Sequence, residues 1–187
     1  MARAMIRTTT LRVALFALLC ASCTNLTPSE QLVSMFEKSI AAEQAEGSTS
    51  RNDAIEKRRK MDRRAERVRE FVENDQLVSA QDSYRAAVLL YDSQKVEDVI
   101  LAQELALRAH DGGLEDGMRI VAHCMDRSLM MRRKPQHFGT QIVFEPVLTK
   151  WRIWDLDPAT TDDERQAFGV APLAELQNRV GYLNEQG

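Results

Sequence analysis

The sequence has little with which to build a disulfide framework. Cysteine occurs three times in 187 residues, at positions 20, 23 and 124, and the first two lie in a leader that we expect to be removed or acylated. Their C-x-x-C spacing does not indicate a redox site, because such a site needs a folded thiol environment. One remaining cysteine forms no internal disulfide, so we interpret Cys124 as a small buried apolar side chain.

Histidine is equally scarce, and no pair of histidines has the spacing of metal ligands. His110, His123 and His137 are the only three, and no His-x-x-x-His or Glu-x-x-His pattern joins two of them on a helix. We therefore predict no metal site and no cofactor. A glycine-rich phosphate loop is also missing, since Gly112-Gly113 alone indicates a turn.

Aromatic residues make up only 6% of the chain, so few side chains are available to stack on nucleic-acid bases. The run from Arg51 to Arg69 is basic, with nine basic and four acidic residues, whereas the chain from Asp155 to the end has seven acidic and two basic residues. The basic run has acids interleaved, so a solvated helix is its simplest interpretation, and contact with an anionic envelope surface is the alternative. We predict no binding to nucleic acid.

The N-terminus has the features of an export signal. Three arginines precede a short apolar run over residues 13–19, which is too short for a permanent membrane span of about 20 residues. The segment Ala21-Ser22-Cys23 resembles the lipobox of bacterial lipoproteins, although Cys20 stands where that family usually has leucine. An ordinary secretory signal that is cut nearby is the alternative.

The lipoprotein resemblance implies an address. Residues 1–22 would be the signal peptide, and Cys23 would be acylated and become the mature N-terminus, anchoring the protein in a membrane. Thr24 follows the cysteine, and a residue other than aspartate there usually accompanies sorting to the outer membrane in Gram-negative lipoproteins. We therefore expect a lipid-anchored protein of the cell envelope, facing the periplasm.

Removal of residues 1–22 leaves 165 residues, enough for one domain with a hydrophobic core. The segment Thr27-Pro28-Ser29-Glu30 predicts a helix start, but Gly47-Ser48-Thr49-Ser50 is typical of a linker. We expect residues 23–50 to form a tether with a weak helix, and residues 51–187 to form a single helical domain.

Apolar residues recur at helical spacing along the first part of that domain. They predict helices over residues 53–74, 77–91, 96–109 and 114–129. The short breaks between the last three predict that consecutive helices pack as antiparallel neighbours. The pattern is similar in style to tetratricopeptide repeats, but it shows no clean period of about 34 residues.

After Gly139 the sequence changes to short β-branched and aromatic runs, which predict a β-hairpin near residues 141–154. Thr161 to Glu164 then predicts a capped helix that Gly169 ends. Pro172 opens a last helix, whose expected buried side is Leu173, Leu176, Val180 and Leu183. The predicted fold class is mainly α, with antiparallel helical hairpins and one small β-hairpin.

One part of the chain resembles an uncharacterised bacterial family. The family shares an Asp-Arg pair on a helix, here Asp126-Arg127, followed by Gln-x-[Phe/Tyr]-Gly-Thr-Gln, here residues 136–141. The segments Asp163-Glu164-Arg165 and Gly169 to Leu173 also fit, so that the similarity covers about residues 60 to 180. The family has no assigned activity, so the resemblance implies no mechanism.

The same region supplies the candidate site residues. Arg119, His123, Asp126 and Arg127 share one face of a helix, and Gln136 and Gln141 follow its C-terminal end. In a structural interpretation, Asp126 pairs with an arginine in a buried network, and the glutamines satisfy backbone groups of the hairpin. In a catalytic interpretation, His123 is a general base and an arginine holds an anionic group.

Two hypotheses about function follow. The first is a lipid-anchored periplasmic helical domain that binds a protein or an anionic envelope partner. The second is a hydrolase-like envelope enzyme that uses His123, Asp126 and Arg127, with Gln136 and Gln141 orienting the substrate. A closed network of these side chains favours the binding domain, and an open pocket where they converge favours the enzyme.

Overall fold

The computed structural model describes residues 26–44 and 50–186. The predicted signal peptide, the predicted lipidation residue Cys23 and most of the predicted linker lie outside this part. The described chain forms seven helices and a two-stranded antiparallel sheet, which confirms the predicted fold class. The elements are α1 (Pro28–Gln44), α2 (Arg51–Glu73), α3 (Ala80–Tyr91), α4 (Val96–Asp111), α5 (Asp116–Met131), β1 (Ile142–Glu145), β2 (Lys150–Ile153), α6 (Asp162–Ala167) and α7 (Leu173–Glu185).

The helix α1 packs on the core of the domain, whereas residues 23–50 were expected to form a tether with a weak helix. It begins as predicted, because the Thr27 backbone N–H donates to the Glu30 carboxylate at 2.7 Å. Leu32 is 0% exposed within the main hydrophobic core, and Met35 packs against that core. The Ser29 hydroxyl also donates to the buried Asp82 carboxylate of α3 at 2.9 Å. Apolar burial and this hydrogen bond hold α1 against α3.

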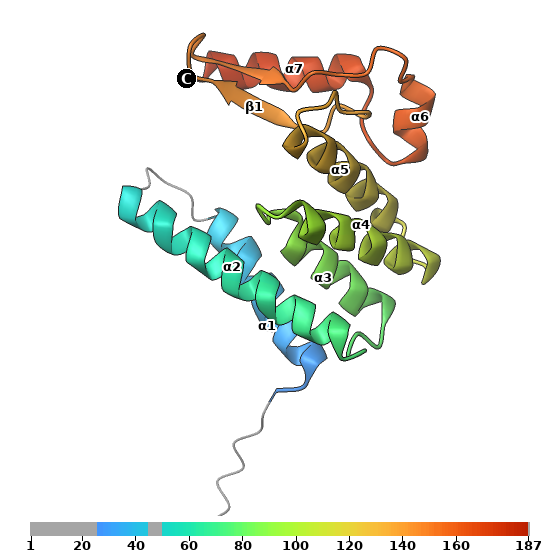
Figure 1. Ribbon diagram of the computed structural model, residues 1–187. Helices are drawn as coiled ribbons and strands as arrows, with labels where there is room; N and C mark the ends of the chain where they lie inside the picture. Colours follow the sequence, from blue (N-terminus) through green and yellow to red (C-terminus); the bar gives the residue numbers. More distant parts are fainter. Residues whose placement is uncertain (1–25, 45–49, 187) are drawn as a thin grey trace, which may run out of the picture.

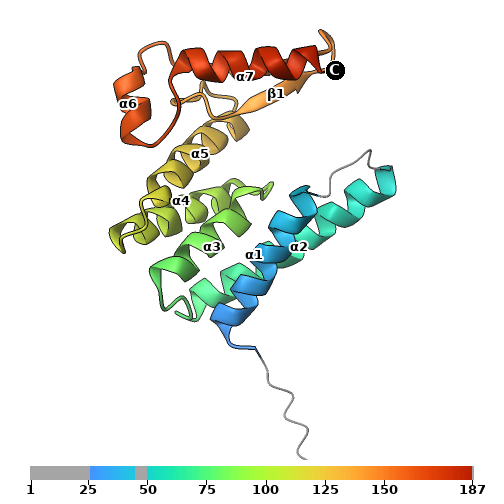
Figure 2. The same ribbon diagram turned by 180° about the vertical axis from the view of Figure 1, so that it is seen from behind.

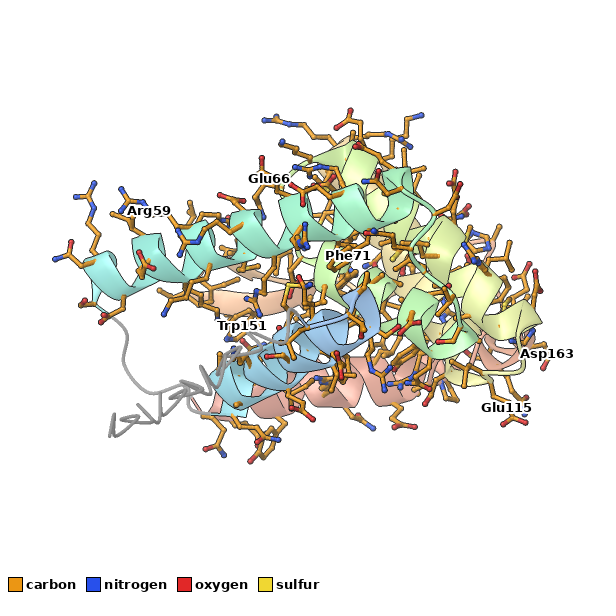
Figure 3. All side chains as sticks on the ribbon, turned by 90° about the horizontal axis from the view of Figure 1, so that it is seen from below. Arg59, Glu66, Phe71, Glu115, Trp151 and Asp163 are labelled. Atoms are coloured by element: carbon orange, nitrogen blue, oxygen red, sulfur yellow. The ribbon has the colours of Figure 1, made fainter. Side chains whose placement is uncertain are left out.

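The helix α2 has two different halves. Its C-terminal half buries Ala65, Val68 and Phe71 in the core, and Figure 3 shows Phe71 beneath the helix. The N-terminal half begins at a capping box between Ser50 and Asp53, although the sequence around Ser50 is typical of a linker. This half projects beyond the other helices, beside α1 (Figures 1 and 2). Most residues of this charged half are exposed to solvent.

The helices α3, α4 and α5 are joined by short turns and pack on one another (Figure 1), as the short breaks between the apolar segments predict. The crossing of α4 and α5 is close at Gly117, where an added Cβ would lie 2.7 Å from the Ala106 carbonyl oxygen. No helix in residues 26–44 or 50–186 is long and apolar enough to cross a membrane. The bundle places the C-terminal end of α5 beside the β-hairpin.

The C-terminal part comprises the hairpin, α6 and α7, which lie beyond the end of α5 (Figure 2). The predicted hairpin is confirmed, with Ile142 opposite Ile153 and Glu145 opposite Lys150. The Asn184 side chain of α7 accepts from the Trp151 N–H at 2.6 Å and donates to its carbonyl at 3.0 Å. This pair of bonds holds β2 against α7.

The helix start predicted at Thr161 to Glu164 and the helix end predicted at Gly169 are both confirmed. Thr161 and Glu164 form the capping box of α6, and Gly169 follows the helix with a φ of 66°, a left-handed conformation that glycine adopts without strain. Leu176 of α7 is buried, and the other apolar residues expected on that side are half-buried.

Candidate functional site

The carboxylate of Asp126 organises the junction between α5 and the hairpin. Asp126 is 0% exposed. One carboxylate oxygen accepts from the backbone N–H groups of His137 and Phe138 at 2.7 and 2.9 Å. The other accepts from the Thr140 N–H and hydroxyl, both at 2.9 Å. A buried carboxylate thus receives four hydrogen bonds from one loop, which offset the cost of removing its charge from water.

The loop can approach Asp126 because its backbone bends sharply. Gly139 has a φ of 92°, and a side chain there would meet Leu176 at 3.1 Å from its Cβ. Pro135 disfavours a helical conformation at Lys134, and α5 ends shortly before it, at Met131. These residues turn successive N–H groups inward, so that they reach the carboxylate.

The two glutamines connect this loop to the hairpin, as the structural interpretation expected. The Gln136 amide donates to the carbonyls of Gln141 and Trp154 at 3.0 and 2.9 Å, and accepts from the Gln141 N–H at 2.8 Å. The Gln141 amide donates to the Tyr91 hydroxyl at 3.0 Å. Both glutamines are buried, and their hydrogen-bonding capacity is used by the fold.

The prediction that Asp126 pairs with an arginine is wrong. All four hydrogen bonds to its carboxylate come from the loop, and no arginine of the described chain forms an ion pair with it. Arg127 instead donates to the carbonyls of Asp92 and Ser93 at 3.3 and 3.2 Å and lies over the Tyr91 ring. Adjacent residues of a helix point about 100° apart, which explains why the two side chains serve different neighbours.

A second buried charge, Arg165, was not among the predicted site residues. It is 2% exposed, and it donates to the Phe138 and Thr160 carbonyls at 2.9 and 3.2 Å and to Asp162 at 2.9 Å. It therefore holds the loop from the opposite side. In the sequence, only the family resemblance singles out Arg165, and no spacing argument links it to a loop 27 residues earlier.

His123 is half-buried and contacts the Tyr91 ring edge-on, with centroids 5.9 Å apart. Burial, and then the positive charge of Arg119, lower its pKa below the ordinary value of 6.5. Within the described chain no hydrogen bond joins its imidazole to Asp126 or to any other side chain. Asp126 and Arg127 are thus close to His123 in the sequence, but the fold does not place His123 and Asp126 as an acid–base pair.

The arrangement around Asp126 is a closed network. Its carboxylate oxygens are occupied by backbone donors, and the glutamine amides are occupied by strand and loop groups. A general base needs a free lone pair directed at a substrate proton, and Asp126 offers none. In the described part of the chain no group of three or more potential ligands is arranged to hold a metal ion.

A large cavity lies elsewhere, between α1, the projecting half of α2, the α3–α4 turn and α5. Its volume is about 1200 Å³. We call it the basic groove, because its lining has seven basic side chains, Lys38, Lys57, Arg58, Lys60, Arg63, Arg64 and Arg127, against the four acidic ones of Glu43, Asp53, Glu56 and Asp92. Only Arg127 was a predicted site residue.

Apolar surface accompanies these charges. Met35 and Ala42 of α1, and Ala54 and Met61 of α2, also line the basic groove. Burial lowers the pKa of the Arg64 guanidinium below its ordinary value, while Asp92 and Glu43 oppose that shift. The groove therefore combines methionine side chains, which adapt to varied shapes, with partly desolvated positive charge.

Comparison with family models, with curated proteins and with solved structures finds no match for this chain. The resemblance to an uncharacterised bacterial family stays a prediction.

Proposed function

We propose that the protein is a lipid-anchored helical binding domain of the cell envelope, which takes an acidic amphipathic segment of a partner protein into the basic groove. The observation that carries the proposal is the groove itself, a concavity of about 1200 Å³ whose lining has three more basic than acidic side chains. Complementary charge steers such a segment, and apolar contact holds it.

The shape of the groove favours a peptide over a membrane surface. A flat anionic bilayer contacts convex or planar basic faces, whereas these basic side chains line a concavity between helices. Four acidic side chains stand among them, and they would repel a uniformly anionic surface. An amphipathic helix that presents acidic and apolar residues at separate positions fits such a mixed lining, in the manner of helix-in-groove recognition.

The closed network around Asp126 supports a structural role for that cluster and removes the main support for the hydrolase-like alternative. That enzyme would need His123, Asp126 and Arg127 to face one substrate. Asp126 faces the 137–140 loop and Arg127 faces the α3–α4 turn. The binding hypothesis uses Arg127 and leaves Asp126 to the fold.

The envelope address rests on the lipobox-like segment and has its own test. Cys23→Ala should abolish acylation and leave an unprocessed or soluble protein, because only that thiol is in place to receive the lipid. Cys20→Ala is the matched control, and it should be processed normally. Metabolic labelling with palmitate and membrane fractionation would measure both, and a Cys23→Ala protein that still carries lipid would overturn the address.

The binding proposal is tested with a fluorescein-labelled amphipathic peptide that has glutamates on one helical face and leucines on the other. Its fluorescence anisotropy should rise with the purified full-length protein, and the affinity should fall as salt increases, because the screening length shortens to about 3 Å at 1 M. The same peptide with glutamine in place of glutamate is the control. Equal binding of both peptides, or stronger binding to phosphatidylglycerol vesicles than to the peptide, would contradict the proposal.

The groove charges can be removed without dismantling the fold. Changing Arg58, Lys60, Arg63 and Arg64, which all line the basic groove, together to glutamine should abolish peptide binding. Exposed charges contribute within about 0.5 kcal/mol each to the free energy of unfolding, and these four side chains are exposed or half-buried. A variant that melts like the wild type and still binds the acidic peptide would show that the peptide binds elsewhere.

A further inference from the structure

Two arginines from distant parts of the chain meet at one point of the basic groove. Arg58 comes from the projecting half of α2, and Arg127 comes from α5. Between them lies Gln94, in the turn between α3 and α4. When its amide is oriented by its hydrogen-bonding partners, the oxygen accepts from Arg58 Nη1 and Nη2 at 3.1 and 3.2 Å and from Arg127 Nη2 at 3.2 Å. One neutral oxygen thus receives three donors from two cations.

We propose that this point is an oxyanion subsite, where a carboxylate of the acidic partner segment displaces the Gln94 oxygen and is held by Arg58 and Arg127. The inference rests on the proposed function and gives it a location. An amide oxygen has two lone pairs, whereas a carboxylate has about four acceptor sites and a full charge. Charge-assisted bonds between guanidinium and carboxylate groups are about twice as strong as neutral ones.

The N–H groups of the two arginines are not all matched by acceptors of the protein. The Nε atom of Arg127 is buried and has no hydrogen-bond partner, and its Nη2 divides its bonds among Gln94 and the Asp92 and Ser93 carbonyls. Arg58 is exposed to solvent along part of its length, and within the described chain it forms no ion pair. Buried donors without acceptors are costly, so a ligand that supplies acceptors gains affinity here.

The position of Arg127 has a structural explanation, since its contacts with the α3–α4 turn hold α5 against that turn. Those contacts do not explain Arg58, whose guanidinium directs both of its Nη donors at Gln94. Gln94 is itself exposed, so a carboxylate reaches this point from solvent. The acid Asp92 also lines the groove, but its carboxylate forms no ion pair with Arg58 or Arg127 in the described chain.

The first test compares two neighbouring arginines. Arg58→Gln removes one side of the subsite, whereas Arg59→Gln makes the same charge change one residue later, where the side chain does not line the groove and points outward on α2 (Figure 3). With the labelled glutamate peptide and full-length protein, Arg58→Gln should weaken binding about tenfold or more, and Arg59→Gln by less than about twofold. Equal losses would mean diffuse attraction and would overturn the subsite.

The second test places a carboxylate in the subsite permanently. Gln94→Glu should raise the melting temperature, because both arginines gain a charged partner, and it should abolish peptide binding, because the subsite is already filled. Gln177→Glu makes the same change on an exposed position of α7 and should do neither. A Gln94→Glu protein that binds the peptide as the wild type does, or that melts no higher than Gln177→Glu, would overturn the subsite.

The two tests separate this inference from the proposed function. If the wild type binds no acidic peptide, the proposed function fails, and the melting temperature of Gln94→Glu still reports whether Arg58 and Arg127 accept a carboxylate. If the wild type binds the peptide but Arg58→Gln and Gln94→Glu bind equally well, the proposed function stands and the subsite fails.

Discussion

At the scale of the residue, the most informative side chain is Asp126, whose charge serves the backbone. It accepts from the N–H groups of three residues in one loop, His137, Phe138 and Thr140. Such a carboxylate acts like the cap of a helix, except that it lies within α5 and gathers the donors of a distant segment. Its contribution is therefore to the position of the loop and, through Gln136, to the start of the hairpin.

Removal of this acceptor should be costly. Asp126→Ala leaves three backbone N–H groups without a partner, and each buried unsatisfied donor costs about 1–3 kcal/mol, so we expect a loss of at least about 3 kcal/mol. Asp116→Ala is the control on the same helix, where the side chain is exposed and pairs only with Arg119, and it should cost within about 0.5 kcal/mol. Urea unfolding measures both, and equal stabilities would contradict the network.

Urea unfolding of alanine variants also distinguishes Asp126 from its neighbour Arg127. Arg127→Ala loses two bonds to carbonyls and a contact with the Tyr91 ring, together about 1–2 kcal/mol. The buried carboxylate should therefore matter more for stability than the arginine beside it. If the two residues formed a buried ion pair, removing either one would be similarly costly.

The His123 imidazole gives a prediction about pH. Its pKa is lowered, by burial first and then by Arg119, so the unfolded chain binds the proton more readily than the folded chain. Its contribution to stability is present above about pH 6.5 and is lost as the pH falls through the lowered pKa. An NMR titration of the His123 ring, assigned with His123→Gln, should give a midpoint below 6.5, and a midpoint at or above that value would contradict the burial.

How far these residue roles could be predicted depends on distance along the chain. The glutamine roles were foreseen, because Gln136 and Gln141 lie beside the hairpin whose backbone they satisfy. The partner of Asp126 was not, because an arginine one residue away looked closer than backbone groups 11 to 14 residues later. Every non-proline residue has a backbone N–H group, so the sequence does not show which of these groups will meet a buried carboxylate.

At the scale of the element, α1 changes the boundary of the domain. The helix lies along α3 and α2 (Figures 1 and 2), so the fold begins well before the charged helix that we took as its start. The lipid anchor expected at Cys23 would then be attached to the fold by a few residues only. The lining of the basic groove also depends on α1, which supplies Met35, Lys38 and Glu43.

Leu32 tests whether α1 belongs to the domain. Leu32→Ala should lower the free energy of unfolding by about 2–5 kcal/mol, as is usual for a buried leucine. Leu26→Ala, at a position that is 51% exposed, should cost within about 0.5 kcal/mol. Equal values in urea unfolding of the full-length protein would mean that α1 is only a tether.

Most elements could be predicted because their signals are local. Apolar spacing marked α2 to α5, and capping residues marked the starts of α1 and α6. The start of α2 was assigned less well, since Ser50 ends a glycine- and serine-rich stretch yet caps the helix. Whether α1 packs or swings free depends on tertiary contacts, and a stripe of apolar residues cannot decide that by itself.

At the scale of the whole molecule, structure and candidate function occupy different places. The Asp126 network lies where α5 meets the C-terminal part, and it is closed. The basic groove lies between the N-terminal helices and the far side of α5, and it is open. The single helix α5 carries both, with Asp126 directed to one and Arg127 to the other.

The basic groove could not be predicted from the sequence, although five of its seven basic side chains come from the run that was recognised as basic. The run from Arg51 to Arg69 was seen as basic, and a solvated face was its simplest interpretation. The structure changes this interpretation, because α1 and the α3–α4 turn face the basic run and form a concavity with it. Arg58 and Arg127 lie 69 positions apart in the sequence, on two helices, and they meet at a turn between two others, so no spacing rule could have found this contact.

The central claim is that the protein binds its partner in the basic groove and uses the Asp126 network only to fold. The most direct test is a two-dimensional amide NMR titration of the full-length protein with the glutamate peptide. We predict that the perturbed amides cluster around Arg58, Arg64, Gln94 and Arg127, while those of residues 137–141 do not shift. Perturbations centred on His123 and residues 136–141, with the groove unaffected, would contradict the account.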